Sequence, residues 1–332
     1  IARDLRRRGA KALIGLVGVQ SNQFDRALDM AREFRAEGLA VMIGGFHVAG
    51  CISMLKEIPA EIQQALDLGC SLFAGEAEEQ RLDEVFRDAW NGELKPIYNY
   101  LKELPGLEGA PLPVLPIDAL RRNSQSWSSF DLGRGCPFQC SFCTIINVQG
   151  RKSRFRTADD LEGIVRENLA QGIKAFFVTD DNLARNRHWE AFFDRLIGLG
   201  EEEGLKANLT IQVDTLCHRI PNFIDKAVRA GVKRVFIGLE NINPDNLIAA
   251  NKRQNKITEY RHMIQQWHER GVNTIGTVLQ QFEDSPQHHM DNDQRTKEDH
   301  RVLDDRADID IAMFVIVDMR GDRRLLRGLC RT

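Results

Sequence analysis

Strand-like and helix-like patterns of apolar positions alternate along the first hundred residues. The run KALIGLVGV is largely apolar and is bounded by turn residues, as in a strand covered on both faces. Phe24, Ala27, Leu28 and Ala31 then recur at helical spacing, with charged residues between them. The runs LAVMIGG and SLFAGE repeat the strand pattern. Helical patterns begin at Pro59, before SLFAGE, and extend from about Glu78 to Ala89 after it. This βα order predicts a parallel sheet in an open, doubly wound, Rossmann-like α/β domain over residues 1–105.

Polar residues and glycines follow the strands of this predicted sheet. Ligands of open parallel sheets bind beyond the carboxyl ends of the strands, and a glycine there lets a flat or phosphorylated ligand approach the backbone. Glycines in strand-to-helix turns are also common without any ligand. The residues that we expect at this edge are Gln20, Ser21, Gly44, Gly45, His47, Gly75 and Glu76.

The periodic pattern fades where prolines accumulate. Pro105, Pro111, Pro113 and Pro116 are interleaved with leucines and a valine, which is typical of an ordered crossing segment more than of a flexible tether. We therefore predict a linker over residues 106–125.

A second series of strand and helix patterns follows the linker. The predicted strands are SSFDLG, AFFVTDDN, ANLTIQVD, RVFIGLEN, NTIGTVL and IDIAMFVIV, with helical patterns between them. In ANLTIQVD three aliphatic residues alternate with a polar face that includes Gln212 and Asp214, so one face packs on helices and the other lines a polar lumen. This pattern predicts a partial (βα)6, TIM-like barrel over residues 126–332.

Composition and charge narrow the class of protein. The chain is 42% apolar and 28% charged, as in ordinary globular proteins, and its longest apolar run is too short to cross a bilayer, so we expect a cytoplasmic protein without a membrane span. The net charge of -3 gives no general surface for nucleic acid. A local basic group, Arg151, Lys152, Arg154 and Arg156, either binds an anionic substrate or belongs to a solvated loop. Because the chain opens on Ile1, we expect a truncated or processed start.

Three of the seven cysteines lie in the segment GRGCPFQCSFCTI. Thiolates at Cys136, Cys140 and Cys143 can ligate three corners of a cubic iron–sulfur cluster and leave the fourth iron open to another molecule. Zinc binding and a chance grouping are the alternatives, and the lack of a nearby histidine in the sequence disfavours zinc. The isolated cysteines, which we expect to be small buried hydrophobes and not disulfide partners, are Cys51, Cys70, Cys217 and Cys330.

The cysteine segment resembles the radical S-adenosylmethionine (radical SAM) enzymes. It matches their Cys-x3-Cys-x-aromatic-Cys motif, with Phe142 in the aromatic position beside the adenine. The resemblance implies a 4Fe–4S cluster that binds S-adenosylmethionine and reduces its sulfonium, releasing a 5′-deoxyadenosyl radical. It also implies contacts with the methionine amino group, the ribose and the adenine, although each of these side chains could instead cap a helix. These residues are Asp180, Asp181, Asn182, Gln212, Asp214, Glu240, Gly276 and Val278.

The first sheet resembles the cobalamin-binding domain that precedes the barrel in one subclass of this family. The resemblance implies that Gly44 and Gly45 receive the corrin or its nucleotide tail. The Asp-x-His-x-x-Gly motif of histidine-ligated cobalamin proteins is absent from the sequence, so the lower axial position is not expected to hold that histidine. His47 is either a substitute ligand or a turn residue.

The resemblance implies cobalamin-dependent methyl transfer to an unactivated carbon of a small-molecule or lipid-like substrate, with an electron donor such as flavodoxin or ferredoxin. A radical cyclase or rearrangement enzyme is the alternative within the family. A non-catalytic iron–sulfur or corrinoid-binding protein is suggested by LQQFEDSP and DMRGD, which replace the family's Gly-Phe-Pro turn and its later proline and glycine loop. A dinucleotide-dependent oxidoreductase is disfavoured because no Gly-x-Gly-x-x-Gly turn follows a predicted strand.

Overall fold

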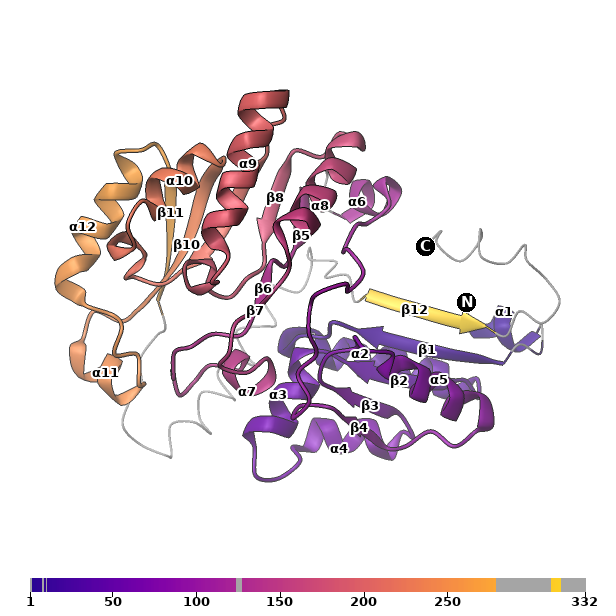
Figure 1. Ribbon diagram of the computed structural model, residues 1–332. Coiled ribbons are helices and arrows are strands. Elements are labelled where there is room, and N and C mark those ends of the chain that lie inside the picture. Colours follow the sequence, from indigo (N-terminus) through magenta and orange to yellow (C-terminus); the bar gives the residue numbers. More distant parts are fainter. Residues whose placement is uncertain (1, 8, 10, 124–126, 279–311, 318–332) are drawn as a thin grey trace. The chain divides into compact units, whose positions relative to one another are not determined.

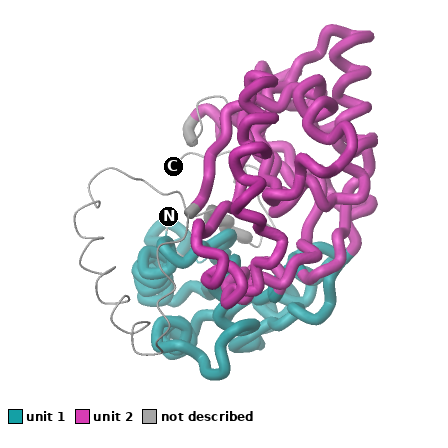
Figure 2. The backbone as a smooth tube through the Cα atoms, turned by 90° about the vertical axis from the view of Figure 1, so that its left-hand side faces the viewer, with its two compact units in different colours: residues 1–105, 147–149, 309–332 teal, residues 106–146, 150–308 magenta. Residues whose placement is uncertain are grey.

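The computed structural model resolves the chain into two compact units (Figures 1 and 2). Most of the first unit comes from the N-terminal third of the chain, and most of the second from the part that follows Pro105. The first unit comprises residues 1–105, 147–149 and 309–332, and the second comprises residues 106–146 and 150–308. Within these ranges, the structure describes residues 2–7, 9, 11–123, 127–278 and 312–317.

The first unit contains a five-stranded sheet in the order β12-β1-β2-β3-β4. Strands β1 to β4 are parallel, with Leu13 opposite Ala40 and Met42 opposite Ser71. The strands are β1 (Ala12–Val17), β2 (Ala40–Gly44), β3 (Ser71–Ala74), β4 (Ile97–Asn99) and β12 (Ala312–Val317).

Helices cover both faces of this sheet (Figure 1). The core on one face joins Ile14 and Ile43 to α2, α3 and α4, whereas Leu13 and Met42 on the other face pack against α5. The alternation of side chains along β1 and β2 therefore supplies both cores. The helices of this unit are α1 (Ala2–Arg7), α2 (Phe24–Ala36), α3 (Phe46–Met54), α4 (Ala60–Asp67) and α5 (Arg81–Asn91).

Strand β12 contains most of the run that the sequence pattern assigned to the barrel, and that assignment is wrong. The strand pairs antiparallel with β1 along its whole length, from Ala12 opposite Val317 to Val17 opposite Ala312. Because β2 occupies only one edge of β1, the other edge presents unpaired backbone groups that an extended apolar segment can satisfy. Apolar periodicity identifies such a segment as a strand but does not specify its neighbour.

The second unit contains the parallel sheet β11-β10-β9-β8-β5 and a two-stranded ladder of β6 and β7. The strands are β5 (Trp127–Phe130), β6 (Gly133–Arg134), β7 (Arg154–Phe155), β8 (Ala175–Val178), β9 (Asn208–Val213), β10 (Val232–Glu240) and β11 (Asn273–Val278). The later helices are α6 (Ile117–Asn123), α7 (Ile145–Val148), α8 (Ala158–Ala170), α9 (Trp189–Glu203), α10 (Phe223–Arg229), α11 (Pro244–Ala249) and α12 (Ile257–His268).

One hydrophobic core joins this sheet to α8, α9, α10 and α12. Leu209, Ile211 and Val213 of β9 belong to that core together with Phe192 of α9 and Trp267 of α12. The predicted apolar face of β9 is therefore confirmed. The opposite face of the sheet carries residues that line a cavity, such as Gln212 and Phe236. Barrels of the βα type bind their ligands near the carboxyl ends of such strands.

The α/β class and the parallel sheets are confirmed. A doubly wound sheet also requires a reversal of strand order, and the described strands β1 to β4 follow the chain order, so that finer description stays a prediction. The assignment of residues 1–105, 106–125 and 126–332 to functional domains also stays a prediction. Part of the predicted linker forms α6, whose Leu120 is buried in the core of the second unit. No helix in the described ranges combines the length and apolar character that crossing a bilayer requires.

Candidate functional site

The cysteine loop, defined as residues 135–153, is held by backbone hydrogen bonds to residues of the second unit. It lies between β6 and β7, which pair antiparallel and bring its two ends together. The N–H of Cys136 donates to the carbonyl of Gly150 at 3.2 Å. The N–H of Ser141 donates at 3.0 Å to the carbonyl of Ala250, just after α11. The loop is thus attached both to its own base and to the segment that follows β10.

Gly133, at the start of this ladder, cannot carry a side chain. A Cβ there would lie 2.6 Å from Nδ2 of Asn186 and 2.8 Å from the carbonyl oxygen of Arg154, closer than real contacts allow. The carboxylate of Asp180 accepts hydrogen bonds from the N–H groups of Gly133 and Leu132, at 3.0 and 2.6 Å, and from Asn186 at 3.0 Å. Burial raises the pKa of Asp180 to about 6. Asp180 therefore positions the chain that enters the cysteine loop.

All three cysteines of the loop line one cavity at the carboxyl ends of the strands. Aromatic side chains form part of the wall, and polar side chains from the ends of β8, β9 and β10 form another part. The residues predicted to contact S-adenosylmethionine that line this cavity are Phe142, Asp181, Asn182, Gln212, Asp214 and Glu240.

The remaining predicted contacts have other positions. Asp180 is not part of the described cavity wall, because its carboxylate faces the backbone of Leu132 and Gly133. A Cβ on Gly276 would lie 2.7 Å from Leu239, and the neighbouring Thr277 lines the cavity in its place. The side chain of Val278 lies outside the described residues.

The spacing of the three thiols distinguishes between a single ion and a cluster. Three thiolates on one zinc ion, at 2.3 Å each, would be about 3.8 Å apart. Among the described residues, Cys136, Cys140 and Cys143 do not form a group whose sulfur atoms all lie within 4.8 Å of one another. Three irons of a cubic cluster need the wider spacing. Among the described residues, the three thiols are therefore not drawn together around a single ion.

Burial controls the protonation of the loop thiols. It raises the pKa of Cys136 and Cys143 above the ordinary thiol value. Nε2 of Gln254 donates a hydrogen bond to Sγ of Cys140 at 3.4 Å. A metal cluster must displace protons from buried thiols as it binds, so loading of the site is coupled to pH.

The carboxylate of Asp214 accepts hydrogen bonds from other protein groups, although Asp214 lines the cavity. Arg185 binds both its carboxylate oxygens, with Nε at 2.7 Å and Nη2 at 2.8 Å, and Asn182 donates to it at 3.0 Å. The N–H of Leu216 adds a fourth hydrogen bond at 2.7 Å. This bidentate pair fixes the end of β9 against the turn after β8. Its geometry fits a structural role better than the predicted contact with ribose.

Asp181 and Gln212 present polar groups to the cavity. Burial, and after it the negative charge of Asp180, raises the pKa of Asp181 to about 7. Nε2 of Gln212 donates to the backbone carbonyl of Asp180 at 3.3 Å, which leaves its amide oxygen able to accept a hydrogen bond. These two side chains can receive hydrogen bonds from a bound ligand.

Glu240 forms an ion pair with Lys252 within the cavity wall. Their side chains are 11% and 10% exposed. Glu240 has a φ of +61° and lies at an irregularity in the pairing of β10 with β11. A Cβ on Gly238 would lie 2.5 Å from Oε1 of Glu240 and 2.7 Å from Nζ of Lys252, so a side chain there would displace the ends of both side chains.

Sequence reasoning missed several residues of the cavity wall. Phe236 lies opposite Gln212 in the parallel register, so alternation along β10 could have identified it. Lys252 and Gln254 come from the turn after α11, where the polar run NKRQNK gave no periodic signal. Phe138 lies inside the cysteine segment itself, 5.4 Å from the guanidinium carbon of Arg185.

The basic group at residues 151–156 was predicted either to bind an anionic substrate or to belong to a solvated loop, and neither prediction describes Arg156. Its side chain is buried and binds Asp131, with Nη2 at 3.2 Å from Oδ1, and also donates to backbone carbonyls. Arg154 belongs to β7. Arg151 and Lys152 are exposed in the loop. Arg156 is therefore a structural residue and is not available to an anionic substrate.

The glycines at the strand ends of the first unit are explained by the protein's own packing. Gly45 has a φ of +142°, and a Cβ there would lie 2.2 Å from the backbone nitrogen of Val19. A Cβ on Gly44 would lie 3.3 Å from Phe73, and one on Gly75 would lie 3.0 Å from Tyr100. The backbone contact excludes a side chain at Gly45, and the close neighbours restrict side chains at Gly44 and Gly75, even when no ligand is bound. The glycines alone therefore do not identify a corrin site.

The polar residues at the same strand ends have defined surroundings. His47 is the second residue of α3, not a turn residue, and its Nδ1 lies 3.1 Å from Oγ of Ser21. Gln20 and Ser21 are exposed directly after β1. Glu76 is buried after β3, and its carbonyl accepts a hydrogen bond from Arg81 at 3.1 Å.

The second unit is thus an α/β domain whose parallel sheet carries three thiols at a cavity near the carboxyl ends of its strands. Residues 131–289 match the model of the Radical SAM superfamily. The chain therefore contains a radical SAM domain.

Curated relatives cover both units of the chain. It is 29% identical over 286 residues to bacteriochlorophyllide d C-8(2)-methyltransferase of Chlorobaculum tepidum, covering 80% of this chain and 58% of that protein. It is 27% identical over 260 residues to bacteriochlorophyllide d C-12(1)-methyltransferase of the same organism, covering 75% and 52%. The chain thus spans little more than half the length of these relatives.

Solved structures share the fold. TsrM of Kitasatospora setae, a radical S-adenosylmethionine methyltransferase solved with cobalamin and a 4Fe–4S cluster bound, superposes with a TM-score of 0.65 at 15% identity, over 83% of this chain and 60% of that one. OxsB, a cobalamin-dependent S-adenosylmethionine radical enzyme, superposes with a TM-score of 0.62 at 16% identity, over 83% and 42%.

Proposed function

We propose that this chain carries the catalytic site of a radical SAM enzyme, with a 4Fe–4S cluster on Cys136, Cys140 and Cys143 and S-adenosylmethionine in the adjoining cavity. One observation carries the proposal: the three thiols line the same cavity as Asp181 and Glu240, which come from the ends of β8 and β10. A cluster bound there would supply the electron that cleaves the sulfonium. The protein's own contribution is to hold the reactants together and away from water.

The side chains around the cavity would have distinct tasks. The carboxylate of Asp181 can accept hydrogen bonds from the ammonium group of S-adenosylmethionine. Gln212 and Glu240 can accept hydrogen bonds from ribose hydroxyls. Lys252 compensates the charge of Glu240 so that a buried carboxylate can face the ligand. Phe142 offers an apolar surface beside the adenine.

We further propose that the reaction is cobalamin-dependent methyl transfer to an unactivated carbon. Relatives named as methyltransferases, and a fold shared with TsrM and OxsB, support this proposal. Cobalamin would bind at the strand ends of the first unit, near Gln20 and Ser21. A radical cyclase or rearrangement enzyme remains the alternative within the family.

The substrate that we propose is a small, largely apolar molecule or a lipid-like one. The names of the relatives specify a bacteriochlorophyllide and, for a protein of Rhodopseudomonas palustris that is 26% identical over 164 residues, a hopanoid. Both names refer to polycyclic, largely apolar compounds, which agree with the substrate class that we propose. The electron would come from a small donor protein such as flavodoxin or ferredoxin.

Anaerobic reconstitution tests the proposal. Protein loaded with iron and sulfide, then given S-adenosylmethionine and dithionite, should form 5′-deoxyadenosine. Cys140→Ala should abolish the product, whereas Cys217→Ala, which removes a buried thiol elsewhere in the same unit, should retain it. A cluster-loaded protein that forms no 5′-deoxyadenosine would contradict the proposed activity and favour a non-catalytic cluster protein.

A second measurement tests the methyl transfer. S-Adenosylmethionine labelled in its methyl group is added together with hydroxocobalamin and reductant. Label recovered on cobalamin supports the methyltransferase, whereas 5′-deoxyadenosine without any transfer of label favours a cyclase or rearrangement. Gln20→Ala, at an exposed position, tests the cobalamin site without changing the packing that the glycines serve.

A further inference from the structure

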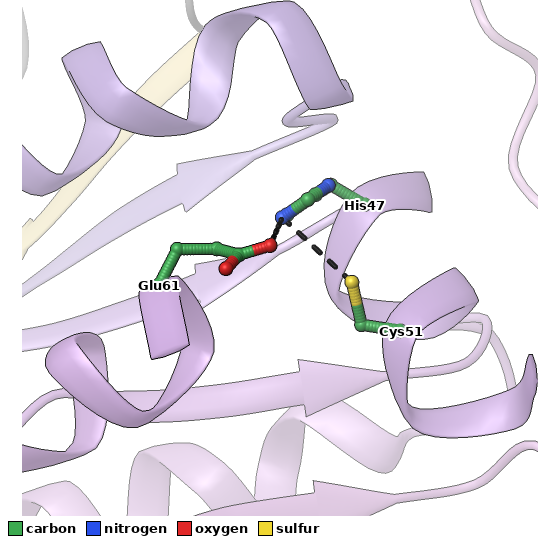
Figure 3. A group of neighbouring side chains, drawn as sticks. All are labelled: His47, Cys51 and Glu61. Atoms are coloured by element: carbon green, nitrogen blue, oxygen red, sulfur yellow. Dashed lines mark hydrogen bonds and ion pairs between the residues drawn. The ribbon is translucent and has the colours of Figure 1, made fainter. Parts of the chain in front are cut away.

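His47, Cys51 and Glu61 bring three ligand atoms of different kinds together in the first unit, away from the cysteine loop in sequence (Figure 3). The imidazole nitrogen Nε2 lies 3.8 Å from Sγ of Cys51 and 3.8 Å from Oε1 of Glu61. All three ligand atoms lie within 4.8 Å of one another. Tetrahedral zinc, with ligands at 2.0 to 2.3 Å, would set them roughly 3.4 to 3.7 Å apart. The group therefore needs only a small contraction to hold one ion.

The backbone positions these ligands without strain. His47 and Cys51 are four residues apart on α3, so they project from one face of that helix. Glu61 is the second residue of α4, and Figure 3 shows its carboxylate turned toward the imidazole. An ion at this point would join the two helices across the connecting residues 55–59.

Ser21 supplies a separate sign of a metal site. Its Oγ lies 3.1 Å from Nδ1 of His47, the nitrogen that faces away from Cys51 and Glu61. When Nδ1–H donates to that hydroxyl, Nε2 keeps its lone pair directed at the other two ligands. Histidines that bind metals usually have their second nitrogen fixed in this way.

We propose that His47, Cys51 and Glu61 bind one zinc-type divalent ion that ties α3 to α4. A thiolate with an imidazole selects zinc or cobalt over magnesium and calcium, which prefer oxygen ligands. The side chain of Glu61 is 41% exposed and that of His47 is 11% exposed, so water can complete the coordination from the side of Glu61. The imidazole of His47 is then a ligand of this ion and does not serve as the axial ligand of a cobalamin.

Cobalt(II) is the probe for this site, because a thiolate bound to it gives an intense charge-transfer band. The full chain is used with Cys136, Cys140 and Cys143 all replaced by alanine, so that the result does not depend on the proposed cluster or activity. We expect a band that saturates at one equivalent of cobalt and disappears when one equivalent of zinc is added.

The variants assign the ligands. Cys51→Ser should abolish the band, and His47→Ala and Glu61→Gln should each weaken cobalt binding at least about tenfold. Glu57→Gln, an exposed carboxylate in the connecting segment, should leave binding unchanged. A band that survives Cys51→Ser, or titration without saturation at one equivalent, overturns the proposal.

A second measurement serves if the triple alanine variant does not fold. Zinc is then determined in cluster-loaded wild-type protein and in cluster-loaded Cys51→Ser. We expect close to one zinc per chain in the wild type and a loss of that zinc in the variant. Equal zinc contents would reject the site.

Discussion

Lys252 donates a hydrogen bond to the carboxylate of Glu240, and both side chains are almost completely buried in the wall of the cysteine-lined cavity. The two residues come from different elements, the end of β10 and the turn after α11. Their pairing therefore fixes that turn, which also carries Gln254, against the sheet.

Lys252→Met should destabilise the protein strongly. The substitution leaves the carboxylate of Glu240 buried without its cation, a change that typically costs about 3–5 kcal/mol. Glu240→Gln combined with Lys252→Met removes both charges and should recover a large part of that loss. Urea unfolding of the wild type, the two single variants and the double variant measures the coupling, and additive effects would contradict it.

Asp181→Asn and Asp180→Asn form a matched pair of neighbouring carboxylates. Asp181 lines the cavity, so its loss should weaken the binding of S-adenosylmethionine to cluster-loaded protein by about tenfold to a hundredfold, as expected for a charge-assisted hydrogen bond. Asp180 faces the backbone of Gly133, so its substitution should lower stability and change affinity much less. Affinity can be read from the perturbation of the reduced-cluster spin signal at pH 8. Equal losses of affinity in both variants would argue against a ligand contact for Asp181 and a structural role for Asp180.

The stability of the protein should depend on the protonation of Asp180. Its pKa of about 6 in the folded state lies above the ordinary value of 3.8, so the proton stabilises the folded protein. That contribution is complete below pH 3.8 and is lost as the pH rises through 6. Asp180→Asn removes this contribution. The free energy of unfolding of the variant, relative to wild type, should therefore improve by about 2 kcal/mol between pH 4 and pH 7. Asp245→Asn, at an exposed position, is the control in urea unfolding at both pH values.

Single Cys→Ala variants should separate the cluster ligands from buried thiols. Iron and sulfide should be lost from reconstituted Cys136→Ala, Cys140→Ala and Cys143→Ala. Cys217→Ala should keep a full cluster and lose about 1 kcal/mol of stability, because its sulfur is packed in the core of the same unit. Metal analysis with thermal unfolding distinguishes the two effects, and a full cluster in Cys140→Ala would contradict the ligand assignment.

Gly45→Ala should damage the first unit far more than Gly38→Ala. Both glycines have positive φ, at +142° and +75°, but only a Cβ on Gly45 meets the backbone of Val19, at 2.2 Å. Gly38→Ala should cost about 1 kcal/mol for its backbone conformation alone. Gly45→Ala should exceed that by several-fold, because the turn must move. Comparable costs would show that β1 and β2 do not depend on this close approach.

The sequence pattern predicted elements best where apolar periodicity was regular. The five strands β5, β8, β9, β10 and β11 and the helices between them were identified in that way. Helix α3 was missed because Phe46, Val48, Ala49 and Ile52 leave few polar positions to define a face, and Gly50 lowers helical propensity. The partner of β12 could not be predicted, since strand pairing between distant segments depends on which edge is open.

The residues of the candidate site could be predicted where both the residue type and the spacing in the sequence are specific. The three cysteines could be found because their ligand spacing is specific. Glu240 could be found because it ends β10, and Asp181 because it lies shortly after β8. The protein partners of Asp180, Asp214 and Arg156 could not be predicted, because a polar residue at a strand end or in a loop can face either a ligand or the protein's own groups. That choice is made by neighbours such as Arg185, which are distant in sequence from the group that they bind.

The hydrogen bond from the backbone of Ser141 to the carbonyl of Ala250 sets a lower limit on the size of a functional fragment. The cysteine segment looks self-contained as a linear motif, yet its centre is attached to a residue more than a hundred positions later. Gln254, which contacts the sulfur of Cys140, lies still further along. A shortened protein intended for cluster studies should therefore extend at least through residue 254, even though every thiol of the motif precedes residue 144.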